Sequence, residues 1–467
     1  MEQTLKNDKM AVMPVKKLML SMSIPMILSM VLQAVYNIVD SAFVSNMKEN
    51  GEAALNALTL AFPVQMLMVA IGIGTGVGVN VLVAKSLGQG DKERASRAMG
   101  NGVFMAAVID VVFILFGLFG AKAYIRSQTD NPLIAGYATE YLQICCVISF
   151  GIVFFSIYEK VLQATGHSVC STIAQIVGAV TNIILDPIMI YGLLGCPEMG
   201  VKGAAYATVI GQIVSFLIAL LLHLKVGKSL SNQLCYFKPS GNIVKAIYAI
   251  GFPAIIAQAL MSVMTYGLNI ILGGISESMV TAYGLYYKVQ QFVLFAAFGL
   301  RDAITPIVSF SYGMGSRARI RDGMKYGMIF TLILMLAGLL ILEFFAEPFA
   351  RVFGLSGETQ ALCVGAMHIV SISFVFAGAN IAFQGIFQAL DGGMESLIVS
   401  VCRQLVFIFP LAILFAGIAR GDSSLTWLVW TAFPIAEGLS AAAACVLFRR
   451  IYRKRMQPCT GQSLMKK

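Results

Sequence analysis

Long runs of apolar residues separated by short polar segments are the dominant pattern along the 467-residue chain. A helix needs about 20 mainly apolar residues to cross roughly 30 Å of hydrocarbon, and lipid offers backbone N–H and C=O groups no hydrogen-bond partners. The pattern therefore predicts an all-α polytopic membrane protein with twelve transmembrane helices, at 17–45, 54–84, 99–121, 133–157, 168–192, 203–225, 243–273, 279–310, 326–346, 360–386, 395–417 and 425–448.

One shift of 225 residues aligns the chain with itself at several places. It lays the stretch 86–94 (SLGQGDKER) on 311–319 (SYGMGSRAR), 64–65 on 289–290, 163–164 on 388–389, and Gly192 on Gly417. A common offset predicts two homologous six-helix lobes, and because six is even, a pseudo-two-fold axis along the membrane normal relates them. We expect an N-lobe at 1–225, a cytoplasmic linker at 226–242, a C-lobe at 243–448 and a basic cytoplasmic tail at 449–467.

Composition and charge narrow the class of protein further. The chain is 58% hydrophobic and 12% charged, with a mean hydropathy of +0.81, which excludes a soluble enzyme or a nucleic-acid-binding module. The formal charge is +10. The basic residues, Lys160 among them, are concentrated in every second connection between spans, so these connections and both termini are expected in the cytoplasm. The nine cysteines are scattered without a C-x-x-C pair, which predicts neither a zinc site nor a disulfide framework.

Acidic residues inside predicted spans are candidates for function, because a charge in the bilayer core costs about 2.5 to 3.5 kcal/mol on insertion scales. The candidates singled out among them are Asp40, Asp110, Asp186, Asp302 and Glu437. Asp110 has no evident partner, and either a water-lined position or a place in a proton relay would explain it.

Two of these acids are expected at one depth, in the outer half of the N-lobe. Asn37 lies three residues before Asp40, and Asn182 four residues before Asp186, so each amide shares a helix face with its carboxylate. The span that begins at 203 brings Thr208 to the same level. Two carboxylates, two amides and a hydroxyl suit Na⁺, and a carboxylate pair in a dry site also suits H⁺; both ions remain open.

Pro187 is expected to kink the span that carries Asp186. A proline removes one helical hydrogen bond, which leaves a backbone carbonyl free to bind a cation or to rearrange when the cation leaves.

The C-lobe carries its charges differently. Arg301, Asp302, Arg403 and Glu437 are expected at similar depth, where they would form a neutral network of two pairs that binds substrate or serves structure and gating. A polar aromatic patch around Lys288, with Tyr283 and Gln290, suits a planar organic cation or a membrane interface. The glycine run at 72–78 lies mid-membrane, which indicates close helix packing and not a phosphate loop.

Several motifs together resemble the multidrug and toxic compound extrusion (MATE) transporters over nearly the whole chain. They are SIP (23–25), NIVDSAFVS (37–45), SLGQGD (86–91), LQATG (162–166), NIILDP (182–187), GAAYAT (203–208) and RQLVFIFP (403–410). The resemblance is strongest to a prokaryotic branch with an N-lobe cation site, and it implies that this site, a Na⁺ site if the coupling ion is sodium, is formed by Asp40, Asn182, Asp186 and Thr208. Another branch has acidic ligands in spans 7 and 10, where this chain has none. Asp302 falls where some drug-exporting members carry an acid.

The resemblance implies a secondary active antiporter that exports amphipathic, often cationic, drugs or toxic metabolites in exchange for Na⁺ or H⁺ by alternating access. Its location would be the prokaryotic plasma (inner) membrane, its partners the lipid bilayer and a small organic substrate, with no nucleic acid. No cofactor besides the coupling ion is expected, and a monomer is sufficient. The alternatives are a lipid-linked sugar flippase, which needs a cationic cavity, and an intramembrane enzyme, for which the chain offers no H-E-x-x-H, Ser/His dyad or G-x-S-x-G motif.

Overall fold

The computed structural model describes residues 9–47, 51–352 and 357–456, and most of these residues are helical, with no strand among them. The first half of the chain forms α2 (Lys9–Val12), α3 (Val15–Ser45), α4 (Gly51–Gly88), α5 (Lys92–Leu115), η1 (Phe116–Gly120), α6 (Ala121–Arg126), α7 (Pro132–Val147), α8 (Phe150–Ala164), α9 (Ser168–Tyr191), η2 (Leu193–Gly195) and α10 (Val201–Val226). The connection to the second half contains η3 (Leu234–Phe237).

The second half repeats this succession of long helices. It forms α11 (Gly241–Gly273), α12 (Glu277–Gly313), α13 (Arg317–Val352), α14 (Gly357–Ser371), α15 (Ser373–Ala389), α16 (Gly393–Val401), η4 (Cys402–Val406), α17 (Ile408–Gly421), η5 (Ser423–Leu425), α18 (Trp427–Trp430) and α19 (Ala432–Met456). The described residues contain ten helices long and apolar enough to cross a membrane, and twelve when each of two bent helix pairs is one span. The predicted fold class, twelve spans in two six-helix lobes, is confirmed.

The two bent spans occupy equivalent places in the repeat. The axis turns by 47° between α7 and α8 and by 49° between α14 and α15, and the two breaks are separated by almost the same offset as the sequence repeat. Proline occurs at neither break. At the first break, Ser149 donates a hydrogen bond to Asp110 Oδ1 of α5 at 2.6 Å, so the partner that the sequence did not reveal for Asp110 is the hydroxyl at this bend.

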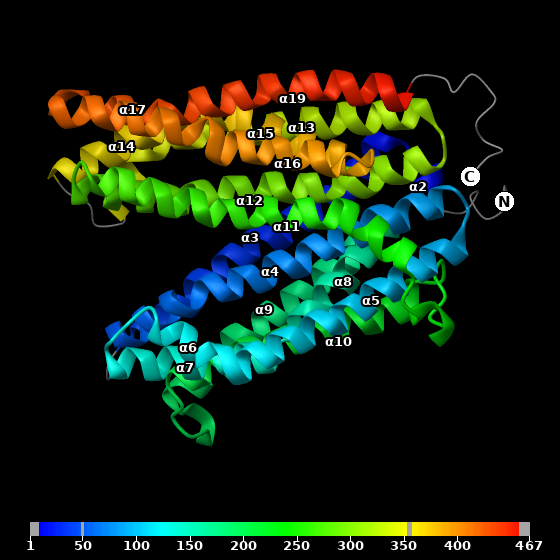
Figure 1. Cartoon of the computed structure of the whole chain (residues 1–467), viewed down its shortest axis with the longest axis horizontal. Coiled ribbons are helices and arrows are strands. Elements are labelled where there is room, and N and C mark those ends of the chain that lie inside the picture. The colour runs from blue at the N-terminus through cyan, green and yellow to red at the C-terminus, as the bar shows by residue number, and fades with distance from the viewer. Residues whose placement is uncertain (1–8, 48–50, 353–356, 457–467) are drawn as a thin grey trace.

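The lobes pack together at one end of the bundle and diverge toward the other. Figure 1 shows α2 and the end of α19 at one end, called here the α2 end, and the two groups of helices spreading apart toward α7 and α14. One hydrophobic core extends through the N-lobe, and at the α2 end it joins N-lobe residues such as Leu87 and Ala164 to C-lobe residues such as Phe310 and Phe387. The core around Tyr283 belongs to the C-lobe alone.

Helices from the two lobes also pack across the interface in a pseudo-symmetric manner. Helix α3 packs on α12, and its repeat partner α11 packs on α4. Helices α4 and α12 cross where a Cβ on Gly88 would lie 3.1 Å from Met314 N and a Cβ on Gly313 would lie 3.1 Å from Lys85 Cα. Gly88 and Gly313 are equivalent residues of the repeated SLG and SYG motifs, so the motif that revealed the repeat is the place where its two copies meet.

The glycine run of α4 packs against two helices, α8 and α11. A Cβ on Gly76 would lie 2.8 Å from Lys160 Cγ of α8, and one on Gly74 would lie 2.8 Å from Ile255 N of α11. Gly72 and Gly78 follow the same alternation, toward α8 and α11 respectively. The expectation of close helix packing is confirmed, and the packing joins α4 to both lobes.

Candidate functional site

The N-lobe acids meet in a buried cluster between α3, α9 and α10. Asp186 and Asn182 are 0% and 2% exposed, and Asp40 and Thr208 are 9% and 4% exposed. Asn182 Nδ2 donates to Asp186 Oδ1 at 3.2 Å, as the four-residue spacing predicts. Asp40 lies within electrostatic range of Asp186. Asn37 lies on α3, but its side chain is outside the described residues.

Small residues allow α9 and α10 to approach closely enough to build this cluster. A Cβ on Gly211 would lie 2.8 Å from Gly178 O and 3.0 Å from the Asn182 Cβ. Gly192 ends α9 in the left-handed conformation, at φ 72°, which glycine adopts without strain. Backbone bonds from Met199 and Gly200 then return the chain alongside the end of α9. Helix α10 therefore starts beside α9, and Thr208 lies one turn before Gly211, the residue that meets Asn182.

The cluster contains one unsatisfied oxygen from each of its four residues. Within the described part of the chain, Asp40 Oδ1, Asn182 Oδ1, Asp186 Oδ2 and Thr208 Oγ1 are buried and accept or donate no hydrogen bond. A buried polar atom without a partner costs about 1–3 kcal/mol, and a cation or a proton bound here would relieve that cost. Oxygen ligands are those that hard cations prefer. The described residues contain no group of three His, Cys, Asp or Glu side chains that could hold a metal ion.

Helix α9 continues through Pro187 without a break and ends at Tyr191. Because proline has no N–H, the carbonyl of Ile183 four residues earlier has no helical donor. The predicted rearrangement at Pro187 stays a prediction.

Polar residues on α4 and α7, which the sequence did not mark as site residues, lie near the acidic cluster. Gln65 Nε2 donates to Tyr141 Oη at 3.3 Å and lies 3.5 Å from Cys145 Sγ. Tyr141 and Cys145 interact electrostatically with Asp40. Polar residues of these common types carry no sequence signal of their own, because only the fold brings them to the acid.

The two predicted C-lobe ion pairs are present. Arg403 Nε bonds to Glu437 Oε1, and the second oxygen of Glu437 accepts from Asn380 Nδ2 at 2.8 Å. Arg301 Nη2 donates to Asp302 Oδ1 at 3.1 Å. Both predicted pairs are therefore formed.

Asp302 has a stronger partner in the other lobe. Lys160 Nζ lies 2.5 Å from Asp302 Oδ2, and both side chains are almost fully buried. The expectation that Lys160 lies in a cytoplasmic connection is wrong, because α8 continues to Ala164 and holds the lysine inside the bundle. Its neighbour Glu159 is a further buried acid, which accepts from Gln163 Nε2 at 3.0 Å.

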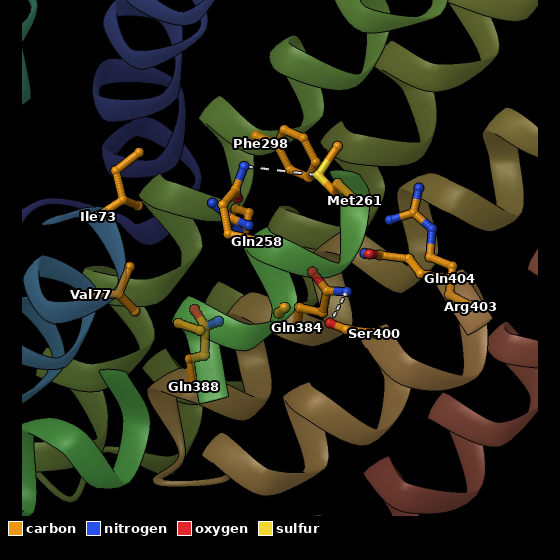
Figure 2. A pocket seen from close by; sticks show the side chains of 13 residues that line it. Ile73, Val77, Gln258, Met261, Phe298, Gln384, Gln388, Ser400, Arg403 and Gln404 are labelled. Atoms are coloured by element: carbon orange, nitrogen blue, oxygen red, sulfur yellow. Dashed lines mark hydrogen bonds between the residues drawn. The ribbon is translucent and has the colours of Figure 1, made fainter. Parts of the chain in front are cut away.

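A cavity lies against this network, between α4 of the N-lobe and the helices of the C-lobe (Figure 2). Its lining is Ile73, Val77, Ala254, Ala257, Gln258, Met261, Phe298, Arg301, Gln384, Gln388, Ser400, Arg403 and Gln404. Arg301 and Arg403 thus reach the cavity, whereas Asp302 and Glu437 are not part of its lining. Tyr283 and Gln290 do not line it either: Tyr283 is buried against Phe433, with ring centroids 6.0 Å apart.

Two homologous lobes of membrane-spanning helices, with a buried acidic cluster in one lobe and a cavity at their interface, are the architecture of a membrane transporter. The model of the MatE family matches residues 25–188 and again 253–414. The chain therefore belongs to the MatE family, the multidrug and toxic compound extrusion transporters.

The chain is similar to relatives over almost the whole length of each. The multidrug export protein MepA of Staphylococcus saprophyticus is 24% identical over 92% of both chains, and MepA of Staphylococcus aureus strain MRSA252 is 25% identical over 93% of both. A solved structure, described as the outward-facing conformation of a multidrug resistance MATE family transporter of the MOP superfamily, is 26% identical. Its TM-score is 0.88, and the match covers 98% of each chain.

Proposed function

We propose that this membrane protein is a secondary active antiporter, which exports amphipathic organic compounds in exchange for Na⁺ or H⁺ bound at Asp40, Asn182, Asp186 and Thr208. The observation that carries the proposal is the four buried, unsatisfied oxygens of this cluster. The MepA relatives are named as multidrug export proteins, and drugs or toxic metabolites, often cationic, are the substrates we propose. We place the protein as a monomer in a bacterial plasma membrane, with both termini in the cytoplasm.

Coupling requires that ion and substrate favour different conformations. Asp40 lies on α3, and α3 packs on α12 of the other lobe, where a Cβ on Gly299 would lie 2.8 Å from Ile27 Cα. An ion that draws α3 toward Asp186 therefore changes a helix that also forms the interface between the lobes. The helix pair α3 and α12 is our proposed link between ion binding and the closing of the lobes at the end opposite the α2 end.

The test is ethidium efflux from proteoliposomes under an imposed Na⁺ gradient and, separately, an imposed proton gradient. Wild type is compared with Asp40→Asn, Asp186→Asn and the control Asp422→Asn, an exposed acid in the connection before α18. We expect efflux that follows one gradient, is lost in the first two variants and is retained in the control. Efflux that survives both substitutions would contradict the proposed ion site.

The rival flippase has one observation in its favour, which is the pair of arginines at the cavity. A flippase for lipid-linked sugars would move its lipid without either ion gradient, and Asp186→Asn would leave that movement unchanged. The same set of variants, assayed for translocation of a fluorescent lipid phosphate, separates the two functions.

A further inference from the structure

The charged groups that reach the interlobe cavity are all of one sign. Its lining contains the guanidinium groups of Arg301 and Arg403 and no carboxylate. The other polar groups that line it are neutral: Gln258, Gln384, Gln388, Gln404 and Ser400 (Figure 2). The carboxylates that pair with these arginines, Asp302 and Glu437, lie outside the lining, so an anionic group in the cavity would meet guanidinium N–H donors first.

Arg403 is held so that part of its guanidinium remains available. It lies in the π-helical turn η4, in which Phe407 N–H bonds to Cys402 O at 3.0 Å; single π turns inside helices are frequent at functional sites. Glu437 accepts from Nε, and within the described residues Nη1 and Nη2 donate to no acceptor. Two N–H groups on one side of a guanidinium match the two oxygens of a carboxylate or phosphate.

Arg301 presents a second cation whose carboxylate partner is shared. Its Nε and Nη2 atoms donate to Asp302 Oδ1 at 3.2 and 3.1 Å, while Lys160 binds the other oxygen of Asp302. One carboxylate thus serves two cations. Glu159 interacts with the Lys160 side of this group and is not part of the cavity lining.

The rest of the lining suits a molecule that is both polar and apolar. The amide oxygen of Gln404 is buried without a hydrogen-bond partner in the described residues. Ile73 and Val77 of α4, with Met261 and Phe298, form an apolar wall. Phe298 also supports Arg301, whose guanidinium carbon lies 4.9 Å from the ring centroid.

We propose that this cavity binds the anionic head group of an amphipathic organic molecule, a carboxylate, sulfonate or phosphate, with Arg403 and Arg301 as its ligands and the apolar wall against its body. The inference rests on the proposed transport function and extends its substrates from organic cations to organic anions. A free amphipathic anion and a lipid phosphate share this chemistry, and the experiment distinguishes them.

The test uses two probes with the same aromatic body and opposite fixed charges, pyrene-1-sulfonate and (pyren-1-ylmethyl)trimethylammonium. Their efflux from proteoliposomes is measured under the gradient that drives ethidium, beside translocation of a fluorescent phosphatidate. We expect saturable transport of the sulfonate or translocation of the phosphatidate; competition between the two shows that they share one site. Transport of ethidium without either anion would overturn this inference and leave the proposed antiporter standing, whereas failure of ethidium under both gradients would contradict the antiporter itself.

Three variants locate the site. Arg403→Lys keeps a charge beside Glu437 but loses the paired N–H groups, and the double variant Arg403→Gln/Glu437→Gln keeps the network neutral. The third variant is Arg301→Gln. We expect each of the three to raise the half-saturating anion concentration about tenfold, which corresponds to the loss of one charge-assisted hydrogen bond. Lys122→Gln, which replaces an exposed cation on α6 of the N-lobe, is the control. Equal loss of anion and ethidium transport in every variant would indicate a structural role only and overturn the assignment.

Discussion

Thr208 is the residue that distinguishes an ion-binding cluster from an acid pair. Its hydroxyl oxygen is buried and unpartnered on α10, which packs on the helix of Asp186 and Asn182, so its removal should cost an ion ligand and little else. We predict that Thr208→Val raises the ion concentration for half-maximal efflux about tenfold, whereas Thr208→Ser retains the wild-type value.

Thr172 supplies the matched control for this prediction. Its hydroxyl is also buried without a partner, on the same helix as Asp186, but ten residues before Asn182, or about 15 Å along the axis. Thr172→Val should leave the ion dependence unchanged. An equal effect of both threonine substitutions would show that the loss arises from α9 packing and not from a ligand.

The buried ion pair between the lobes joins Lys160 and Asp302, and replacing one or the other should lower the stability of the protein by different amounts. Lys160→Met leaves Asp302 paired with Arg301, whereas Asp302→Asn leaves Lys160 and Arg301 both without their carboxylate. Breaking a buried pair costs about 3–5 kcal/mol when a charge is left uncompensated. We therefore predict a larger loss of thermal stability in detergent for Asp302→Asn than for Lys160→Met; the reverse order would contradict the shared-carboxylate arrangement.

The sequence could predict the acids but not all of their surroundings. Asp40 and Asp186 are conspicuous because a carboxylate in an apolar run is costly, and the spacing to Asn182 identifies a shared face. Lys160 was misplaced because a basic residue four positions before the end of a helix resembles one in a connection. The glutamines of the cavity carry no charge, so nothing in the sequence separates them from other polar residues.

At the scale of helices, the spans were predictable and the bends were not. The hydropathy pattern determines where a helix can cross the membrane, but the breaks beside Ser149 and at Ile372 contain neither proline nor glycine. The bond from Ser149 to Asp110 depends on a contact between α5 and α7–α8, which no local pattern of residues records. Bends of this kind follow from packing.

The crossing of α4 and α12 leads to a prediction about glycine. A Cβ on Gly313 would lie about 3 Å from the Lys85 backbone, so Gly313→Val must push the two helices apart. We predict a loss of about 1–3 kcal/mol, as for other overpacked sites, measured as thermal stability together with ethidium efflux. Gly284→Ala on the same helix, where a Cβ would meet no atom within 4 Å, is the control and should match the wild type. Equal tolerance of both changes would contradict a tight crossing.

For the whole molecule, the closed α2 end is the feature on which the proposed alternating access depends. A shared hydrophobic core, the pair of Lys160 with Asp302, and a second ion pair between Lys85 and Asp391 join the lobes there. Asp391 adopts φ 60°, a left-handed conformation, and its equivalent in the first half is Gly166 at φ 80°. The two copies therefore share the turn, and in the second copy a carboxylate at this position reaches the other lobe.

Transport by alternating access requires these contacts to break in each cycle, so a covalent link across them should stop it. In a background that lacks the exposed cysteines, we predict that Lys85→Cys/Asp391→Cys loses efflux when treated with a cleavable bismaleimide and regains it on reduction. Lys202→Cys/Glu140→Cys is the control, because that exposed ion pair, 3.0 Å long, lies within the N-lobe, and its cross-link should leave efflux intact. Full efflux from a completely cross-linked Lys85–Asp391 pair would show that the lobes need not separate at the α2 end, and the substrate would then require a path that does not cross it.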